Sequence, residues 1–186
     1  MRVLGISGSL RKGSYNQQLV RTAAGLLPDD VEFELFGDLK VVEPYDEDDD
    51  GEATPPGAAR ARAAIAAADA LIIATPEYNS SIPGQLKNAV DWASRPVNEG
   101  ALKGKTVAVV GASKGAFGAV WAQAELRKVL AASGARVVEG EVAVGHAHER
   151  FDGDGRLIDT EAVEQLGEVV DALVASTRET ELLRAS

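Results

Sequence analysis

Short apolar runs alternate with stretches of helical spacing along the chain. The runs predict five strands, at residues 2–7, 31–36, 70–75, 106–110 and 137–144. Apolar residues that recur every three to four positions predict five helices, at residues 14–27, 58–68, 84–94, 117–132 and 159–177. The run at 70–75 is continuously apolar, which is typical of a strand covered on both faces. Residues 38–57 contain three prolines and an acidic run, and they predict a loop.

The alternation of strands and helices predicts an α/β fold. Strands joined through helices form βαβ units, and these build a parallel sheet with helices on both faces. Five such strands fit a flavodoxin-like three-layer sandwich, a five-stranded parallel sheet of order 2-1-3-4-5. No linker or repeat interrupts the pattern, so residues 1–186 predict one domain. In this sheet, ligands bind beyond the carboxyl ends of the first, third and fourth strands.

Composition excludes several classes of function. The chain carries 19 Lys and Arg against 29 Asp and Glu, a formal charge of −10, which does not suit binding to nucleic acid or to an anionic membrane. It has no cysteine and two histidines, so no metal site is expected. No apolar run approaches the roughly 20 residues of a membrane span, and an apolar strand that begins at residue 2 leaves no room for a signal peptide. A cytoplasmic protein is therefore predicted. The acidic segment 46–52 is expected to be solvated, with a functional role as the alternative.

The loop after the first strand, residues 8–16, carries groups that suit a phosphate. It leads into a helix N-terminus, where unpaired N–H groups and a partial positive charge favour an anion. Ser9, Ser14 and Asn16 add neutral donors, and Arg11 adds a charged one. The spacing G-x-x-x-x-G lacks the Lys and Ser/Thr of a P-loop, so a terminal monophosphate bound without metal is favoured. A glycine-rich turn before a helix capped by Ser14 is the structural alternative.

The loops after the third and fourth strands could enclose a planar heterocycle. In residues 75–84, Pro76 and Pro83 stiffen the backbone, and Tyr78 offers an aromatic face with a hydroxyl group. In residues 111–118, small residues allow a ligand to approach the backbone closely. An ordinary turn with a capping serine and a tight strand-to-helix turn explain the same loops without a ligand.

Three stretches resemble the NADPH-dependent FMN reductase family, whose members include quinone, azo-dye and chromate reductases. They are GSLRKGSYN (8–16), TPEYNSSIPGQLKNAVDWASR (75–95) and GASKGAFGAVWAQAELRKVL (111–130). The similarity extends over residues 1–175. The resemblance implies a flavodoxin-like fold, bound FMN, and a homodimer or homotetramer.

The resemblance also assigns roles by position. The residues that would hold the FMN phosphate are Ser9, Arg11, Ser14 and Asn16. Those that would lie along the isoalloxazine ring or close the pocket near it are Pro76, Glu77, Tyr78, Asn79, Ser113 and Gly115. Tyr78 and Arg95 would meet the substrate, Arg95 from the pocket mouth, where it could attract an anionic acceptor or the phosphates of the donor. The alternative for Arg95 is a cation favoured near a helix C-terminus.

One stretch departs from the family pattern. Many relatives read Gly-Gly-x-Arg after the third loop, whereas this chain reads Gly118-Ala119-Val120-Trp121. That position often faces a neighbouring subunit in the family, so the departure affects the expected subunit contact.

The implied activity is that of an oxidoreductase that passes hydride from NADPH or NADH through FMN to a quinone-like or other small acceptor. No catalytic side chain is expected, because the flavin carries the chemistry. Two alternatives stay open, a flavodoxin-type electron carrier without NAD(P)H oxidase activity of its own and a phospho-ligand binder without redox function. The size of the chain and its excess of acidic residues fit the carrier, whereas the reductase-like sequence of residues 76–79 favours the reductase.

Overall fold

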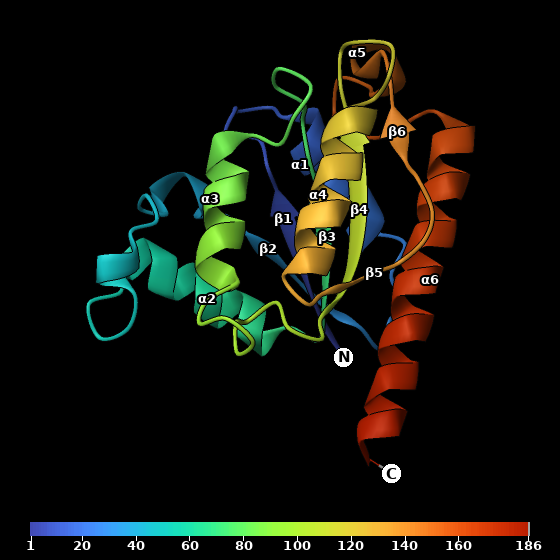
Figure 1. The fold of residues 1–186 in the computed structure, drawn as a ribbon. Coiled ribbons are helices and arrows are strands. Elements are labelled where there is room, and N and C mark those ends of the chain that lie inside the picture. Colours follow the sequence, from blue (N-terminus) through green and yellow to red (C-terminus); the bar gives the residue numbers. More distant parts are fainter. Residues whose placement is uncertain (186) are drawn as a thin grey trace.

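A computed structural model describes residues 1–185 and contains a parallel sheet between two layers of helices (Figure 1). The strands are β1 (Arg2–Ser7), β2 (Glu32–Phe36), β3 (Ala70–Ala74), β4 (Thr106–Ala112), β5 (Arg136–Val137) and β6 (Ala143–Val144). The helices are α1 (Tyr15–Ala24), α2 (Pro56–Ala67), α3 (Gly84–Ala93), α4 (Val120–Ala132), α5 (Ala147–Arg150) and α6 (Thr160–Ala185). The strand order β2-β1-β3-β4-β5, with β6 also on β4, confirms the predicted flavodoxin-like order.

The central strand β3 fixes the layers. All five of its residues are buried, and it pairs in parallel with β1 on one side and β4 on the other. Ile72 belongs to the cluster under α1 and α6, whereas Leu71 and Ile73 belong to the cluster under α3 and α4. Side chains of successive strand residues point to opposite faces, so one apolar strand fills both layers of the core.

The prediction of one continuous strand at 137–144 is wrong. The segment is divided into β5 and β6, and residues 138–142 between them leave the regular ladder; Gly140 adopts a left-handed backbone with φ +109. Arg127 of α4 fills the break, because its guanidinium donates to the carbonyls of Val138 (2.8 Å), Val109 (2.9 Å) and Gly140. Burial lowers the pKa of Arg127, while Glu141 nearby raises it.

Gln123 continues this attachment one turn earlier on α4. Its side chain is 1% exposed, and its Nε2 donates to the carbonyls of Gly118 (3.1 Å) and Val142 (3.2 Å). Helix α4 therefore holds both the loop before it and the edge strand beside it through side chains, where backbone pairing is interrupted.

Helix ends differ from the prediction for identifiable reasons. Helix α4 begins at Val120 and not at 117, because Gly118 and Ala119 take left-handed φ values of +56 and +63. Helix α6 continues to Ala185, since no glycine or proline follows residue 167, and Figure 1 shows it passing beyond the sheet. The short helix α5 was not predicted.

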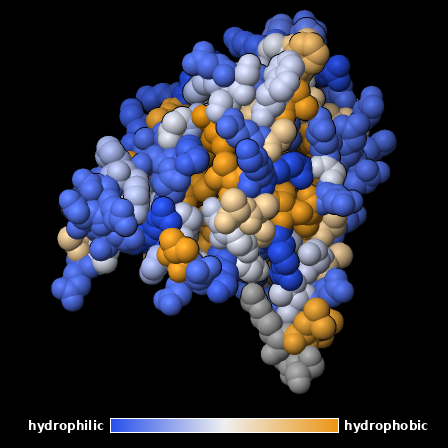
Figure 2. All heavy atoms as spheres, in the orientation of Figure 1, coloured by the Kyte–Doolittle hydropathy of each residue, from blue (hydrophilic) through white to orange (hydrophobic). Residues whose placement is uncertain are grey.

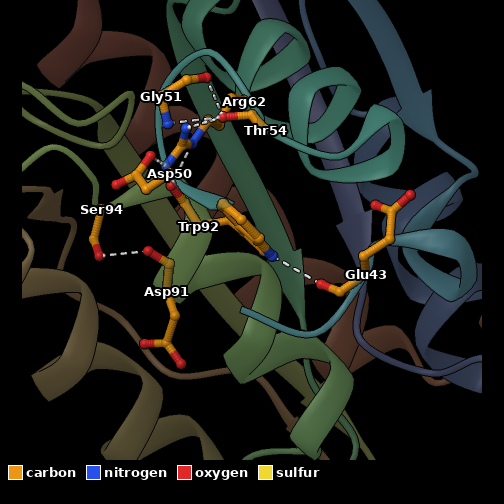
Figure 3. A network of polar contacts seen from close by, with 8 residues as sticks. All are labelled: Glu43, Asp50, Gly51, Thr54, Arg62, Asp91, Trp92 and Ser94. Carbon is orange, nitrogen blue, oxygen red and sulfur yellow. Dashed lines mark hydrogen bonds and ion pairs between the residues drawn. The ribbon is translucent and has the colours of Figure 1, made fainter. Parts of the chain in front are cut away.

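The loop from 38 to 55 is pinned to one face of α3. Two short 3-10 helices, Leu39–Val41 and Glu47–Asp49, lie within this loop. Gln85 Nε2 donates to two loop carbonyls at 2.8 Å each. Figure 3 shows the second attachment, in which the Nε1 of Trp92 donates to the carbonyl of Glu43 at 2.7 Å. Helix α3 therefore holds the loop through the side chains of Gln85 and Trp92.

The acidic part of this loop is also held. Arg62 of α2 donates to Asp50 Oδ1 at 2.6 Å and to the Trp92 carbonyl at 2.7 Å, with its guanidinium carbon 5.0 Å from the centre of the Trp92 ring (Figure 3).

The Glu43 carboxylate accepts from the N–H groups of Gly57 (3.2 Å) and Ala58 (3.0 Å) at the start of α2. A bond from its own backbone N–H lowers the pKa of Glu43 most, and these two amides add to it. This stabilisation is present above the ordinary pKa of a carboxyl group and is lost as the pH falls through the lowered value.

No helix in the described part of the chain is long and apolar enough to cross a membrane.

We expect Arg127→Ala to destabilise the fold by about 1–3 kcal/mol, because it removes the guanidinium donor from the partly buried carbonyls of Val109 and Val138. Urea denaturation measures this. The neighbouring exposed Lys128→Ala is the matched control and should stay within about 0.5 kcal/mol of the wild type. Equal stability of both variants would contradict a role for the guanidinium in the broken strand.

Candidate functional site

The loops after β1, β3 and β4 meet at the carboxyl edge of the sheet and enclose a hollow of about 200 Å³. It is lined by Ser9, Arg11, Ser14, Tyr15, Asn16, Pro76, Glu77, Tyr78, Ala112, Ser113 and Lys114. Eight of these are residues that the sequence singled out. Tyr15, Ala112 and Lys114 were missed, although each is a chain neighbour of a predicted site residue.

The N-terminus of α1 opens onto the hollow. Ser14 is the N-cap, and its Oγ accepts from the N–H of Gln17 at 3.4 Å. The first turn of α1 contains no acidic residue, and among residues 1–185 the N–H groups of Tyr15 and Asn16 have no hydrogen-bond partner. The terminus therefore keeps donors and a partial positive charge for an anion.

The side chain of Asn16 is already occupied. It is 3% exposed, its Nδ2 donates to the Ala112 carbonyl at 2.9 Å, and its Oδ1 accepts from the Ala112 N–H at 2.9 Å. These two bonds tie the start of α1 to the end of β4. Only the backbone N–H of Asn16 is left to face a ligand.

Two cations line the hollow. The guanidinium carbon of Arg11 lies 5.7 Å from the centre of the Tyr15 ring, and Tyr15 packs on Phe151 with ring centres 5.4 Å apart. Lys114 reaches the hollow from the loop after β4 and is exposed, with no ion pair or hydrogen bond to a described residue. The hollow therefore carries excess positive charge in a chain whose net charge is −10.

The second loop forms a tight two-residue turn. Tyr78 and Ser81 exchange backbone hydrogen bonds of 3.2 and 3.1 Å, and Asn79 and Ser80 between them have φ values of +53 and +59. Positive φ at both central residues is the geometry of a type I′ turn. The turn leaves Tyr78 54% exposed at the rim and places Asn79 at its tip, outside the lining.

No serine caps the helix that follows this loop. The N-cap of α3 is Pro83, without a side-chain bond, so the alternative of a capping serine fails. Instead, Ser81 Oγ donates to Glu125 Oε2 of α4 at 2.5 Å. The Glu77 carboxylate also turns toward α4, where it accepts from the N–H groups of Trp121 (3.1 Å) and Ala122 (3.2 Å).

The third loop is folded onto the chain that follows β6. Ser113 Oγ accepts from the Gly115 N–H at 3.1 Å, and the Gly115 carbonyl accepts from the His146 N–H at 3.0 Å. Ser113 lines the hollow, whereas Gly115 does not.

Arg95 lies elsewhere, and its expected place at the pocket mouth is corrected. It follows α3, whose ten residues extend about 15 Å from the loop that begins at Thr75 toward the opposite edge of the sheet (Figure 1). There it lines a separate hollow of about 340 Å³, with its guanidinium carbon 5.7 Å from the centre of the Tyr45 ring. Within one chain, the hollow that Arg95 lines has no lining residue in common with the hollow at the carboxyl edge of the sheet.

Comparison with known proteins gives the family. Residues 1–149 match the family described as NADPH-dependent FMN reductase, and the chain belongs to it. An NAD(P)H-dependent FMN reductase of Pseudomonas aeruginosa is 45% identical over 174 residues, covering 93% of both chains. A 2-hydroxy-1,4-benzoquinone reductase of a Burkholderia species is 38% identical over 181 residues, covering 96% of this chain and 97% of that one.

Solved structures agree with this family. The flavoenzyme NAD(P)H:(acceptor) oxidoreductase FerB of Paracoccus denitrificans has a TM-score of 0.82 and 34% identity, covering 96% of this chain and 97% of that one. A flavodoxin of Pseudomonas aeruginosa, with a TM-score of 0.60 and 18% identity, shares the fold. FMN is the cofactor of this family, with NAD(P)H as electron donor.

No group of three or more histidine, cysteine, aspartate or glutamate residues within residues 1–185 is arranged to hold a metal ion.

Proposed function

We propose that the chain binds FMN in the hollow at the carboxyl edge of the sheet and uses NADPH or NADH to reduce a quinone-like or other small acceptor. The single observation that carries the placement is the open N-terminus of α1 beside Arg11. Among its relatives, one is described as a quinone reductase of Pseudomonas putida and another acts on 2-hydroxy-1,4-benzoquinone by its name. These names support an acceptor of the quinone type.

The residues around the hollow fit the two ends of FMN. Helix α1 lines the hollow with its first turn and has no carboxylate on its first amides, whereas the first amides of α4 already bind Glu77. The phosphate therefore belongs at α1, with Arg11, the hydroxyls of Ser9 and Ser14, and the backbone N–H of Asn16.

The ring end of FMN belongs between the second and third loops. Pro76, Tyr78 and Asn79 would lie along the ring, and Ser113 and Gly115 would close the pocket near it. The hollow of about 200 Å³ is below the range of about 300–1,000 Å³ typical of ligand pockets, so part of the ring would stay open to a substrate or to a second chain.

Bound FMN supplies the hydride and electron chemistry, and the chain supplies binding and orientation. The exposed ring of Tyr78 borders the side from which donor and acceptor would enter in turn. Lys114 on the same rim would attract their negative charges. No side chain is required to move a proton for this role.

An electron carrier is the second candidate function. Its support is the flavodoxin likeness, which at 18% identity concerns the fold alone. The relatives with 34–45% identity are reductases or oxidoreductases by description, and these favour an enzyme with its own NAD(P)H oxidase activity. The cytoplasmic location is likewise our proposal, supported by a chain without cysteine that needs no oxidising compartment.

A homodimer or homotetramer is the proposed assembly. Phe117 and Trp121 stand beside the hollow with 64% and 50% of their surfaces exposed, and their rings meet edge to face at 5.0 Å. Apolar residues also gather between α3 and α4 on the face shown in Figure 2. Exposed aromatic side chains of this kind are enriched at protein interfaces.

The purified protein reconstituted with FMN should be yellow, and the colour should bleach when NADPH or NADH is added without oxygen. A spectrum before and after the addition measures this. Bleaching only in the presence of a separate reductase would favour the carrier, and a protein that binds no FMN would contradict the proposal altogether.

Arg11→Ala should weaken FMN binding about tenfold to a hundredfold, because a charge-assisted bond to the phosphate is worth about 1.5–3 kcal/mol. Equilibrium titration of FMN fluorescence measures the affinity. Lys12→Ala, the exposed neighbour outside the lining, is the matched control and should bind nearly as tightly as the wild type. Equal affinity for FMN in both variants would contradict a phosphate site at this turn.

Sedimentation velocity should find the wild-type chain as a dimer or larger. The double substitution of Phe117→Asp and Trp121→Asp should shift it toward the monomer, because charge is costly in a buried interface. Ile158→Asp, an exposed apolar residue elsewhere on the surface, is the control. A monomeric wild-type chain would contradict the proposed assembly.

A further inference from the structure

Glu77 lies in the loop after β3 and lines the hollow, yet its carboxylate is directed to a helix. Its Oε2 accepts from the N–H groups of Trp121 (3.1 Å) and Ala122 (3.2 Å), 44 and 45 residues further along the chain. The N-cap position of α4 is Ala119, which is left-handed and has no side-chain oxygen. Helix α4 therefore has no cap from its own loop, and Glu77 supplies one from the preceding unit of the sheet.

A second bond runs in parallel with the first. Ser81, at the far side of the type I′ turn, donates from Oγ to Glu125, one turn further along α4. The loop after β3 is thus attached to α4 at both sides of the turn that carries Tyr78. Since Gln123 Nε2 binds the Gly118 carbonyl, α4 also holds the loop after β4. The distance between the two loops depends on these bonds to one helix.

We propose that Glu77 is a positioning residue for the flavin site. By capping α4 it fixes the loop after β3 against the loop after β4 and so sets the gap that receives the ring. It acts through α4 and not by contact with the ring. This inference rests on the proposed FMN site.

The carboxylate has an electrostatic consequence as well. It neutralises the partial positive charge at the start of α4, whereas the start of α1, which lines the hollow, stays open to the phosphate. Loops that are held in place before binding lose less conformational entropy when the ligand binds. Loss of Glu77 should therefore weaken FMN binding without removing any group that touches FMN.

The test compares Glu77→Ala and Glu77→Gln with Glu43→Ala. Glutamine keeps an acceptor oxygen but not the charge. Glu43 is a matched control, because its carboxylate also accepts from two amides at a helix start, at 3.2 and 3.0 Å, on a helix that does not line the hollow. Two quantities are measured, amide hydrogen exchange of Trp121 and Ala122 in the FMN-free protein and the FMN dissociation constant.

In Glu77→Ala, exchange at Trp121 and Ala122 should become faster, and the FMN dissociation constant should rise about threefold or more, up to about thirtyfold, because the stability lost with a helix cap sets the upper limit. Glu77→Gln should fall between this variant and the wild type in both quantities, and it serves as the measurable variant if alanine prevents folding. Glu43→Ala should speed exchange at Gly57 and Ala58 and leave the FMN dissociation constant unchanged.

Three results would overturn the proposal. Faster exchange with unchanged FMN affinity would reduce Glu77 to a stabilising cap. Weaker FMN binding with unchanged exchange would make Glu77 a direct contact of the cofactor. Equal weakening in Glu43→Ala would assign the effect to general loss of stability. Failure of the proposed function is separate, since the wild-type chain itself would then bind no FMN in the same titration.

Discussion

Parallel pairing of β1, β3 and β4, with β3 buried on both faces, is the constraint on which the site depends. Parallel strands present their carboxyl ends at one edge, so three loops that lie about 70 and 35 residues apart in sequence come together there. Helices α1, α3 and α4 follow these loops and begin at this edge. The start of α1 lines the hollow and keeps its first amides free, whereas the first amides of α4 bind Glu77, and this difference is the basis for proposing the phosphate at α1.

Polar side chains complete this scaffold wherever backbone pairing stops. Asn16 joins α1 to the end of β4, Arg127 bridges the break in the edge strand, and Gln85 and Trp92 hold the loop of residues 38–55 against α3. Several of these residues lie in the stretches that resemble the reductase family. A motif that identifies a cofactor site therefore includes residues whose work is to keep the loops around it in place.

At the site, the fold places or uses some residues differently from what the sequence predicted. Arg95 follows a conspicuous motif, but a helix of ten residues carries it to the other edge of the sheet. Asn16 was predicted from its amide as a phosphate donor, whereas the fold uses both polar atoms of that amide on Ala112. Lys114 lines the hollow and was overlooked, because a single lysine in a glycine-rich loop has no pattern that separates it from a solvated one.

The sequence by itself predicted the strands and helices, because apolar periodicity reports which residues a helix or strand buries, and their alternation fitted the parallel order that the structure has. It also predicted the first loop as an anion site, since a helix start without acidic residues is a local feature. Only the tertiary structure decided the break between β5 and β6, the length of α6 and the partner of Glu77. These depend on contacts between residues far apart in the chain, such as Glu77 with Trp121, which no local pattern of residues encodes.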